Sequence, residues 1–164
     1  MPRVYVGIGS NINKEENIRG AVRELATHYG SLTLSPVYES KAIGFEGENF
    51  FNLVAGFDSV DPIEHIKETL LQIEARLGRV RQENSSSSRT LDLDLLLYGD
   101  TVRHDDKVNL PHPDVQRYAF VLRPLADIAP KLRHPETGLT CARMWQQFDA
   151  GKLEMGKKDF DPKQ

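Results

Sequence analysis

Two aspartates separated by one residue, Asp92 and Asp94, lie in a stretch from Arg89 to Gly99 that is rich in leucine. The stretch alternates as a β-strand does, because successive side chains of a strand point to opposite faces of the sheet. Both carboxylates therefore lie on one face, roughly 6–7 Å apart at ~3.3 Å per residue. Like charges this close repel unless a cation lies between them, and oxygen ligands without His or Cys suit Mg²⁺. The alternative is a solvated pair of acids on an exposed sheet face.

The other face of this predicted strand is apolar. It carries Leu91, Leu93, Leu95 and Leu97. Thr90 and Leu96 are predicted on the same face as the two aspartates. The strand should therefore bury one face and present its acids on the other.

Several cationic and polar residues stand near this strand in the sequence and could bind a polyphosphate. Arg79, Arg81 and Arg89 precede the aspartates, and His112 lies between two prolines that hold it on a rigid turn. Guanidinium groups bind phosphate oxygens with paired hydrogen bonds, and Mg²⁺ bridges such oxygens. Each arginine could instead be a solvated surface charge, and His112 a surface histidine. Phe50 is either a stacking platform for a flat ring or a packing residue.

The elements that must position these residues follow the order strand, helix, strand, strand, helix, strand. The sequence places them at Val4–Ile8, 13–30, 32–37 with Pro36 as an interruption, Phe50–Asp58, 61–78 and Arg89–Gly99. Asn13 is predicted to cap the first helix, with Glu16 at its third position. This α+β order predicts a ferredoxin-like βαββαβ core, an antiparallel sheet with both helices on one face.

The opposite sheet face should carry Asp92, Asp94, Phe50 and Asn52, facing solvent unless the rest of the chain covers it. A C-terminal extension follows the core. It is predicted to hold a short extended pair near 102 and 108–110, an apolar segment at 118–125, a short helix at 140–148 and a loose tail from about 152 to 164. We expect residues 1–164 to form one domain.

Composition excludes several classes of protein. The net charge is −3, so the basic excess expected of a nucleic-acid binder is absent. Apolar runs stay shorter than the ~18 residues of a membrane span. The single Cys141 cannot form an internal disulfide, which predicts a reducing cytoplasm and an inert thiol. A monomer is expected, because the sequence shows no obvious exposed apolar helix face.

Several motifs, in the same order along the chain, resemble one family. They are Gly-Ile-Gly-Ser-Asn at 7–11, Val37-Tyr38, Phe-Phe-Asn at 50–52, Ile-Glu at 73–74, Leu-Gly-Arg-Val-Arg at 77–81, Arg-Thr-Leu-Asp-Leu-Asp at 89–94, Leu-Pro-His-Pro at 110–113 and Phe-Val-Leu-Arg-Pro-Leu-Ala-Asp-Ile-Ala-Pro at 120–130. The chain resembles the 6-hydroxymethyl-7,8-dihydropterin pyrophosphokinases of folate biosynthesis along nearly its whole length.

The resemblance implies a role for each matching position. Asp92 and Asp94 would bind two Mg²⁺ ions and act, with Arg79 and Arg89, in catalysis. The pterin would contact Ser40, Ile43, Gly44, Phe50, Asn52 and Phe120, its ring between Phe50 and Phe120. The ATP side would be lined by Glu74, Arg81, Lys107, Asn109 and His112, together with Arg79 and Arg89.

The implied reaction is transfer of the β,γ-pyrophosphoryl group from ATP to the pterin hydroxymethyl oxygen, with release of AMP. The sequence departs from the family pattern in the loop before Arg89, where 85–88 are serines instead of a basic residue and a tryptophan, and at Tyr118, where the family has arginine. The serine loop predicts weaker closure over the substrates. Another Mg²⁺-dependent transferase on the same plan, a ligand-binding module of ferredoxin-like fold and a low-activity paralogue are the alternatives.

Overall fold

The computed structural model describes residues 1–41, 49–77, 91–149 and 155–163. In this part of the chain the elements are β1 (Arg3–Ser10), α1 (Lys14–Tyr29), β2 (Thr33–Leu34), β3 (Val37–Ser40), β4 (Phe50–Asp58), α2 (Ile63–Leu77), β5 (Asp92–Tyr98), β6 (Arg103–His104), β7 (Asn109–Leu110), α3 (Asp114–Arg117), α4 (Ala119–Ile128), α5 (Cys141–Gln147) and β8 (Met155–Lys158). The predicted strands and helices of the βαββαβ core are thus present, but the second predicted strand, 32–37, is two short strands, β2 and β3, separated by Ser35 and Pro36.

The sheet has the strand order β5-β1-β4-β3-β8, with β2 paired to β4 as well. Every neighbouring pair in it is antiparallel. The first and last strands of the core, β1 and β5, lie side by side, and β1 also pairs with β4. This arrangement confirms the ferredoxin-like α+β prediction.

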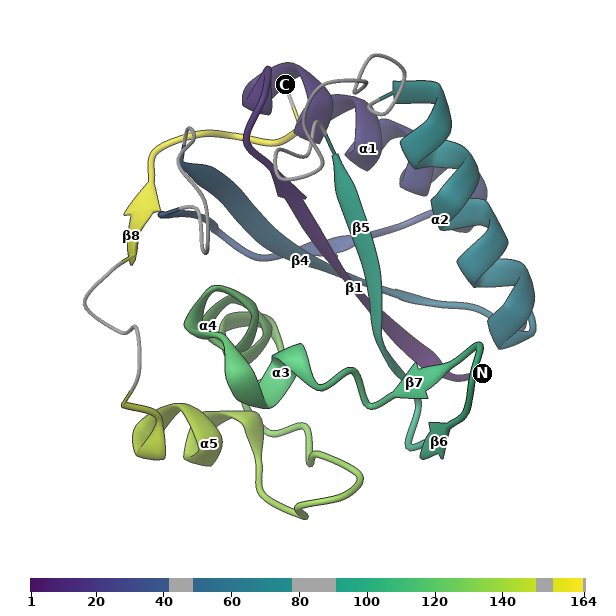
Figure 1. Cartoon of the computed structure of the whole chain (residues 1–164), viewed down its shortest axis with the longest axis vertical. Helices are drawn as coiled ribbons and strands as arrows, with labels where there is room; N and C mark the ends of the chain where they lie inside the picture. Colours follow the sequence, from purple (N-terminus) through teal and green to yellow (C-terminus); the bar gives the residue numbers. More distant parts are fainter. Residues whose placement is uncertain (42–48, 78–90, 150–154, 164) are drawn as a thin grey trace.

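Helices cover both faces of the sheet (Figure 1). On one face α1 and α2 bury Ile18, Leu25, Ile66 and Ile73 against the strands in one apolar core. On the other face α3, α4 and α5 form a second core around Leu122, Leu125 and Met144. The C-terminal extension therefore covers part of the face that carries Asp92, Asp94, Phe50 and Asn52.

The two cores follow the alternation of the strands. In β4 the side chains of Phe51, Leu53, Ala55 and Phe57 enter the core under α1 and α2, as predicted. Val54, on the opposite face of the same strand, enters the core under α4. The period of two along the strand thus assigns each residue to a layer.

The alternation of β5 changes at Leu96, which corrects the prediction for Leu97. The pairing of β1 with β5 shifts register between Tyr5 and Val6, so that Val6 lies opposite Leu95 and Tyr5 opposite Leu97. Leu96 is the extra residue, a β-bulge. Leu91, Leu93 and Leu95 lie in the α1/α2 core as expected, but Leu96 and Leu97 both lie in the second core. The prediction that Leu97 shares a face with Leu95 was wrong.

The end of the chain is not a loose tail throughout, as the sequence had suggested. Met155–Lys158 forms β8 and pairs with β3 from Val37 to Ser40. Phe160 then packs against the α1/α2 core, with its ring 5.9 Å from that of Phe51. The strand pairs because the edge of β3 would otherwise expose unpaired backbone groups.

The first helix begins where predicted but without the predicted cap. Asn13 precedes α1 in a left-handed conformation and its side chain makes no capping hydrogen bond. Asn17, in the first turn, instead ties the helix start to the preceding loop, since its side chain donates to the Ile12 carbonyl. The position of the helix start was right and its mechanism wrong.

Candidate active site

The aspartates of β5 lie beside two glycines of β1. Asp94 pairs with Gly7 and Asp92 with Gly9 in the antiparallel register. Because glycine has no side chain, the neighbouring strand leaves open space on this face. This space is a cavity of about 380 Å³ between the sheet on one side and α3 and α4 on the other.

The floor of this first cavity is polar. Asn52 of β4 is buried, and its side-chain nitrogen donates to the Ser40 hydroxyl at 2.8 Å. With the nitrogen facing Ser40, the amide oxygen lies toward Gly9. The complete lining consists of Gly7, Ile8, Gly9, Ser40, Lys41, Phe50, Asn52, Leu53, Val54, Asp92, Asp94, Leu96, Asp114, Tyr118, Phe120 and Val121.

Aromatic rings form part of the wall. Phe50, at the start of β4, and Phe120, in the first turn of α4, both line the cavity. Tyr118 stacks on Phe120 with ring centroids 5.0 Å apart and 15° between their planes. Such a wall suits a flat, partly polar ring.

A second cavity of about 340 Å³ lies on the other side of the aspartates, next to α2. Four of its lining residues, Lys67, Leu70, Leu71 and Glu74, have the spacing of one helical face. The lining is Lys67, Leu70, Leu71, Glu74, Asp92, Leu93, Asp94, Leu95, Val108, Asn109, Leu110 and His112. Lys67 holds the β6–β7 segment beside it, since its ammonium group donates to the Lys107 carbonyl at 2.6 Å.

Asp92 and Asp94 line both cavities. Their side chains therefore lie at the boundary between the first cavity, with its aromatic wall, and the second cavity, which contains Lys67, Asn109 and His112. A group bound between the two carboxylates could contact molecules in both cavities at once.

The environment of Asp94 favours a bound cation. Burial raises the pKa of Asp94 well above its usual range, and the nearby charges of Asp92, Asp114 and Glu74 raise it further. A cation beside these carboxylates would offset their mutual repulsion. The donor set is oxygen-rich, which suits Mg²⁺.

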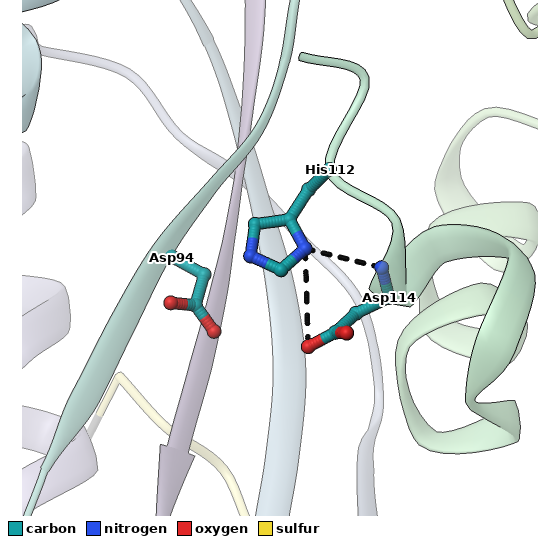
Figure 2. Close-up of side chains that lie close together, drawn as sticks. All are labelled: Asp94, His112 and Asp114. Carbon is teal, nitrogen blue, oxygen red and sulfur yellow. Dashed lines mark hydrogen bonds and ion pairs between the residues drawn. The ribbon is translucent and has the colours of Figure 1, made fainter. Parts of the chain in front are cut away.

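His112 is held beside Asp94 by its backbone and by its ring (Figure 2). Its N–H donates to the carbonyl of the bulged Leu96 at 2.9 Å, so the bulge in β5 also anchors the histidine turn. The ring Nδ1 accepts the backbone N–H of Asp114 at 3.1 Å and lies 3.8 Å from that carboxylate. Possible ligand atoms of Asp94, His112 and Asp114 lie within 4.8 Å of one another.

The ring of His112 is prepared to donate a hydrogen bond. Burial lowers its pKa below the ordinary value, which favours the neutral form. Because Nδ1 accepts a backbone N–H, the proton of the neutral ring sits on Nε2. Nε2 faces Asp94 in Figure 2 and can donate to an anionic ligand there.

The structure brings together most of the residues that the sequence singled out. Ser40, Phe50, Asn52 and Phe120 line the first cavity, and Glu74, Asn109 and His112 line the second. Lys107 is not among the lining residues of either cavity and takes part through its carbonyl. Ile43, Gly44, Arg79, Arg81 and Arg89, and the serines at 85–88, lie outside the described residues.

Arg117, the residue before Tyr118, is an exposed arginine. Its side chain is 62% exposed and lies 4.0 Å from the Asp114 carboxylate. It lines neither cavity. Tyr118 itself contributes an aromatic ring in place of a charge.

Three charged lining residues were missed by sequence reasoning. Lys67 could have been found from its spacing, because it stands one and two turns before Leu70, Leu71 and Glu74 on the same helical face. Asp114 follows the Leu-Pro-His-Pro motif directly, and its acidity beside His112 was the available signal. Lys41 gave no signal, since a lysine at the end of an edge strand is most often solvated.

Comparison with known proteins gives one consistent result. A sequence model of the family described as 7,8-dihydro-6-hydroxymethylpterin-pyrophosphokinase (HPPK) matches residues 5–130. The 2-amino-4-hydroxy-6-hydroxymethyldihydropteridine pyrophosphokinase of Synechocystis is 40% identical over 148 residues, which cover 88% of this chain and 75% of that protein. The enzyme of the same name from Haemophilus influenzae is 34% identical over 160 residues, 93% of this chain and 97% of that one.

Solved structures agree on the fold. The HPPK-DHPS of Plasmodium falciparum superposes with a TM-score of 0.75 at 11% identity, over 95% of this chain and 48% of that chain. This chain therefore spans about half the length of that protein, and the likeness at this identity concerns the fold alone. None of the helices in the described ranges has the length and apolar character needed to cross a membrane.

Proposed function

The chain belongs to the 7,8-dihydro-6-hydroxymethylpterin-pyrophosphokinase family, and from this premise we propose how its two cavities share the work of that reaction. The enzyme transfers pyrophosphate from ATP to 6-hydroxymethyl-7,8-dihydropterin in folate biosynthesis. The products are the pterin diphosphate and AMP.

The first cavity is proposed to bind the pterin. The flat pterin ring fits beside Phe50 and Phe120, and the amide of Asn52 hydrogen-bonds the polar edge of the ring. Since the Asn52 nitrogen donates to Ser40, its oxygen is the atom that accepts a hydrogen bond from a ring N–H. Ile43 and Gly44 would complete this pocket.

The second cavity is proposed to bind the nucleotide. Leu70, Leu71 and Val108 offer apolar surface for the adenine, while Asn109 and His112 offer polar groups. Lys67 adds a positive charge at this wall. We propose that Arg79, Arg81 and Arg89 neutralise the phosphate charge, in keeping with the family resemblance, and that Lys107 lies at the rim.

Asp92 and Asp94 would hold two Mg²⁺ ions between the cavities. Bound there, magnesium would neutralise the triphosphate and lower the pKa of the pterin hydroxyl. The protein contributes to the reaction by positioning the two substrates. The pterin cavity holds the hydroxymethyl group toward the aspartates, and the Nε2–H of His112 donates to a phosphate oxygen on the far side.

The chemical step is a direct displacement that needs no covalent protein intermediate. The pterin hydroxyl oxygen forms a bond to the β-phosphorus, and the bond from that phosphorus to the oxygen shared with the α-phosphorus breaks. AMP leaves with the bridging oxygen, and the hydroxyl proton passes to solvent.

One observation carries this assignment: the two aspartates line both cavities. The test combines purified protein, Mg²⁺, ATP and the pterin alcohol, with AMP and the pterin diphosphate measured by chromatography. We expect both products, and we expect Asp94→Ala to lower kcat by at least about a hundredfold. Asp106→Ala, an exposed acid that lines neither cavity, is the matched control and should keep full activity.

The other outcomes would contradict the proposal. ADP in place of AMP would indicate an ordinary kinase. Substrate binding without any product would indicate a binding module. A single domain, a monomeric state and a cytoplasmic location stay predictions.

A further inference from the structure

The strand that carries the aspartates lies at an edge of the sheet. Among the described residues, β5 pairs with β1 on one side and is the last strand of the sheet on the other. Backbone groups on such an outer edge need partners when they are buried. Leu93, the residue between Asp92 and Asp94, solves this through a side chain: its N–H donates to Oε2 of Glu74 at 2.6 Å.

Glu74 is fixed in place by the helix that carries it. It lies on α2, is 8% exposed, and stands next to Ile73, which is fully buried in the core that Leu91, Leu93 and Leu95 enter from the sheet. Such burial is unusual for a glutamate without a partner. The bond to Leu93 gives one of the carboxylate oxygens a hydrogen-bond partner in this buried position.

The bond acts on the backbone that sets the two aspartates. The Leu93 N–H belongs to the peptide that joins Asp92 to Leu93, so the bond restrains the backbone of Asp92 and of Leu93, the residue that connects Asp92 to Asp94. We infer that Glu74 is a positioning residue of the metal centre, which holds Asp92 and Asp94 at their spacing through this peptide rather than by contact with the nucleotide. The inference rests on the proposed function, because it supposes that the aspartates bind the metal.

Two substitutions of Glu74 distinguish the effect of side-chain length from the effect of side-chain charge. Glu74→Gln keeps the length and an acceptor oxygen but loses the charge, whereas Glu74→Asp keeps the charge but is one methylene too short to reach the Leu93 N–H. Positioning predicts that Gln preserves the metal centre and Asp damages it. A role for the charge, or a direct contact with the nucleotide, predicts the reverse order.

The measurement is Mn²⁺ binding in the presence of α,β-methylene-ATP, which cannot be cleaved at the reacting bond, followed by electron paramagnetic resonance of free Mn²⁺. We expect Glu74→Asp to weaken Mn²⁺ binding at least about tenfold, as loss of an outer-shell partner does, and Glu74→Gln to stay within about threefold of wild type. Steady-state kinetics should show a lower kcat for Glu74→Asp with an unchanged KM for the pterin. Amide hydrogen exchange at Leu93 should be fast in Glu74→Asp and slow in Glu74→Gln.

Thr69→Val is the control for a loss of stability alone, since Thr69 is buried on the same helix but lines neither cavity. It should lower the melting temperature without changing Mn²⁺ affinity. The inference is overturned if Glu74→Gln binds Mn²⁺ as weakly as Glu74→Asp or more weakly. It is also overturned if neither variant changes Mn²⁺ binding. Wild-type protein that binds Mn²⁺ but forms no AMP would instead overturn the proposed function, and the binding data would still decide the role of Glu74.

Discussion

At the scale of single residues, the site depends on what β1 lacks. Tyr5, Gly7 and Gly9 share one face of this strand, but only Tyr5 contributes a side chain, and it enters the core under α4. The two glycines lie opposite Asp94 and Asp92 and leave the space that becomes the first cavity. A Cβ added at Gly9 would lie 3.0 Å from the Asn52 amide oxygen. A Cβ at Gly7 would lie 3.5 Å from Leu96, an ordinary contact.

This difference predicts separate effects for two alanine substitutions. Gly9→Ala should displace the Asn52 amide and raise the KM for the pterin about tenfold, the value of one hydrogen bond of about 1.4 kcal/mol. The KM for ATP should change little, because the second cavity lies beyond the aspartates. Gly7→Ala on the same strand face, where the added Cβ makes an ordinary contact with Leu96, is the comparison and should raise the pterin KM less than Gly9→Ala does. Equal effects in steady-state assays of the two variants would argue against a specific role of Asn52.

At the scale of elements, the first cavity, where we propose that the pterin binds, depends on strands that are held from outside it. Ser40, the partner of Asn52, ends β3, which lies between β4 and β8. β8 is secured by Phe160, whose ring lies against Phe51 and under the guanidinium of Arg19 at 4.4 Å. Residues 155–160 therefore help to fix β3, a strand of the proposed pterin cavity from which they are far removed in sequence.

We predict that Phe160→Ala loosens this support. The loss of a partly buried ring should lower the free energy of unfolding by about 1–2 kcal/mol, less than the ~3–5 kcal/mol expected for a fully buried aromatic side chain. The pterin KM should rise severalfold because Ser40 becomes less fixed. Urea unfolding and steady-state kinetics measure the two effects.

A second aromatic truncation serves as the control. Phe148 stacks on Trp145 at 5.8 Å, at the end of α5, and Phe148→Ala should reduce stability without changing the pterin KM. If both variants raise that KM equally, β8 has no particular connection to the site.

On the same scale, α4 is tied to the sheet by a polar network. The Tyr38 hydroxyl on β3 donates to the carboxylate of Asp127 on α4, and Arg123 lies 3.3 Å from that carboxylate. Burial, together with this hydrogen bond, raises the pKa of Tyr38 to about 12. The network keeps the helix that carries Phe120 over the cavity.

For the whole molecule, helices pack on both faces of the sheet. The candidate site lies between the sheet and the layer formed by α3, α4 and α5. α4 and α5 bury Cys141 in the core that they share with Leu96 and Leu97. The thiol is 1% exposed, and burial raises its pKa to about 11. Because Cys141 is the single cysteine of the chain, its reactivity reports on opening of this layer.

We predict slow modification of Cys141 in the folded enzyme. At pH 8 a thiol with a pKa near 11 is ionised to about one part in a thousand, against roughly a quarter for an ordinary thiol. Modification by a disulfide reagent should therefore be at least about a hundredfold slower than in guanidinium-unfolded protein. It should slow further when ATP analogue and pterin are bound, because ligands that bind the folded state oppose its opening. Immediate labelling of the native protein would contradict the burial of this thiol.

Local patterns were enough to predict much of this protein. Alternation located β1, β4 and β5, and helical spacing with Gly or Pro at the ends located α1 and α2. The order of these elements led to the ferredoxin-like core. The alternation of the Asp-Leu-Asp strand and of β4 was sufficient to place two carboxylates on the sheet face that also carries Phe50 and Asn52. These features depend on neighbours within a few residues, where geometry repeats with a fixed period.

Other features depend on contacts between distant parts of the chain, and no local pattern carries them. Leu97 changes layer because a bulge at Leu96 is set by pairing with β1. Met155–Lys158 becomes a strand because the edge of β3 is available to it. Glu74 matches a family motif, but its bond to Leu93 exists because α2 packs across β5. The alternation of β5 indicated a pair of acids, whereas the packing of helices on both sides of the sheet put that pair between two cavities.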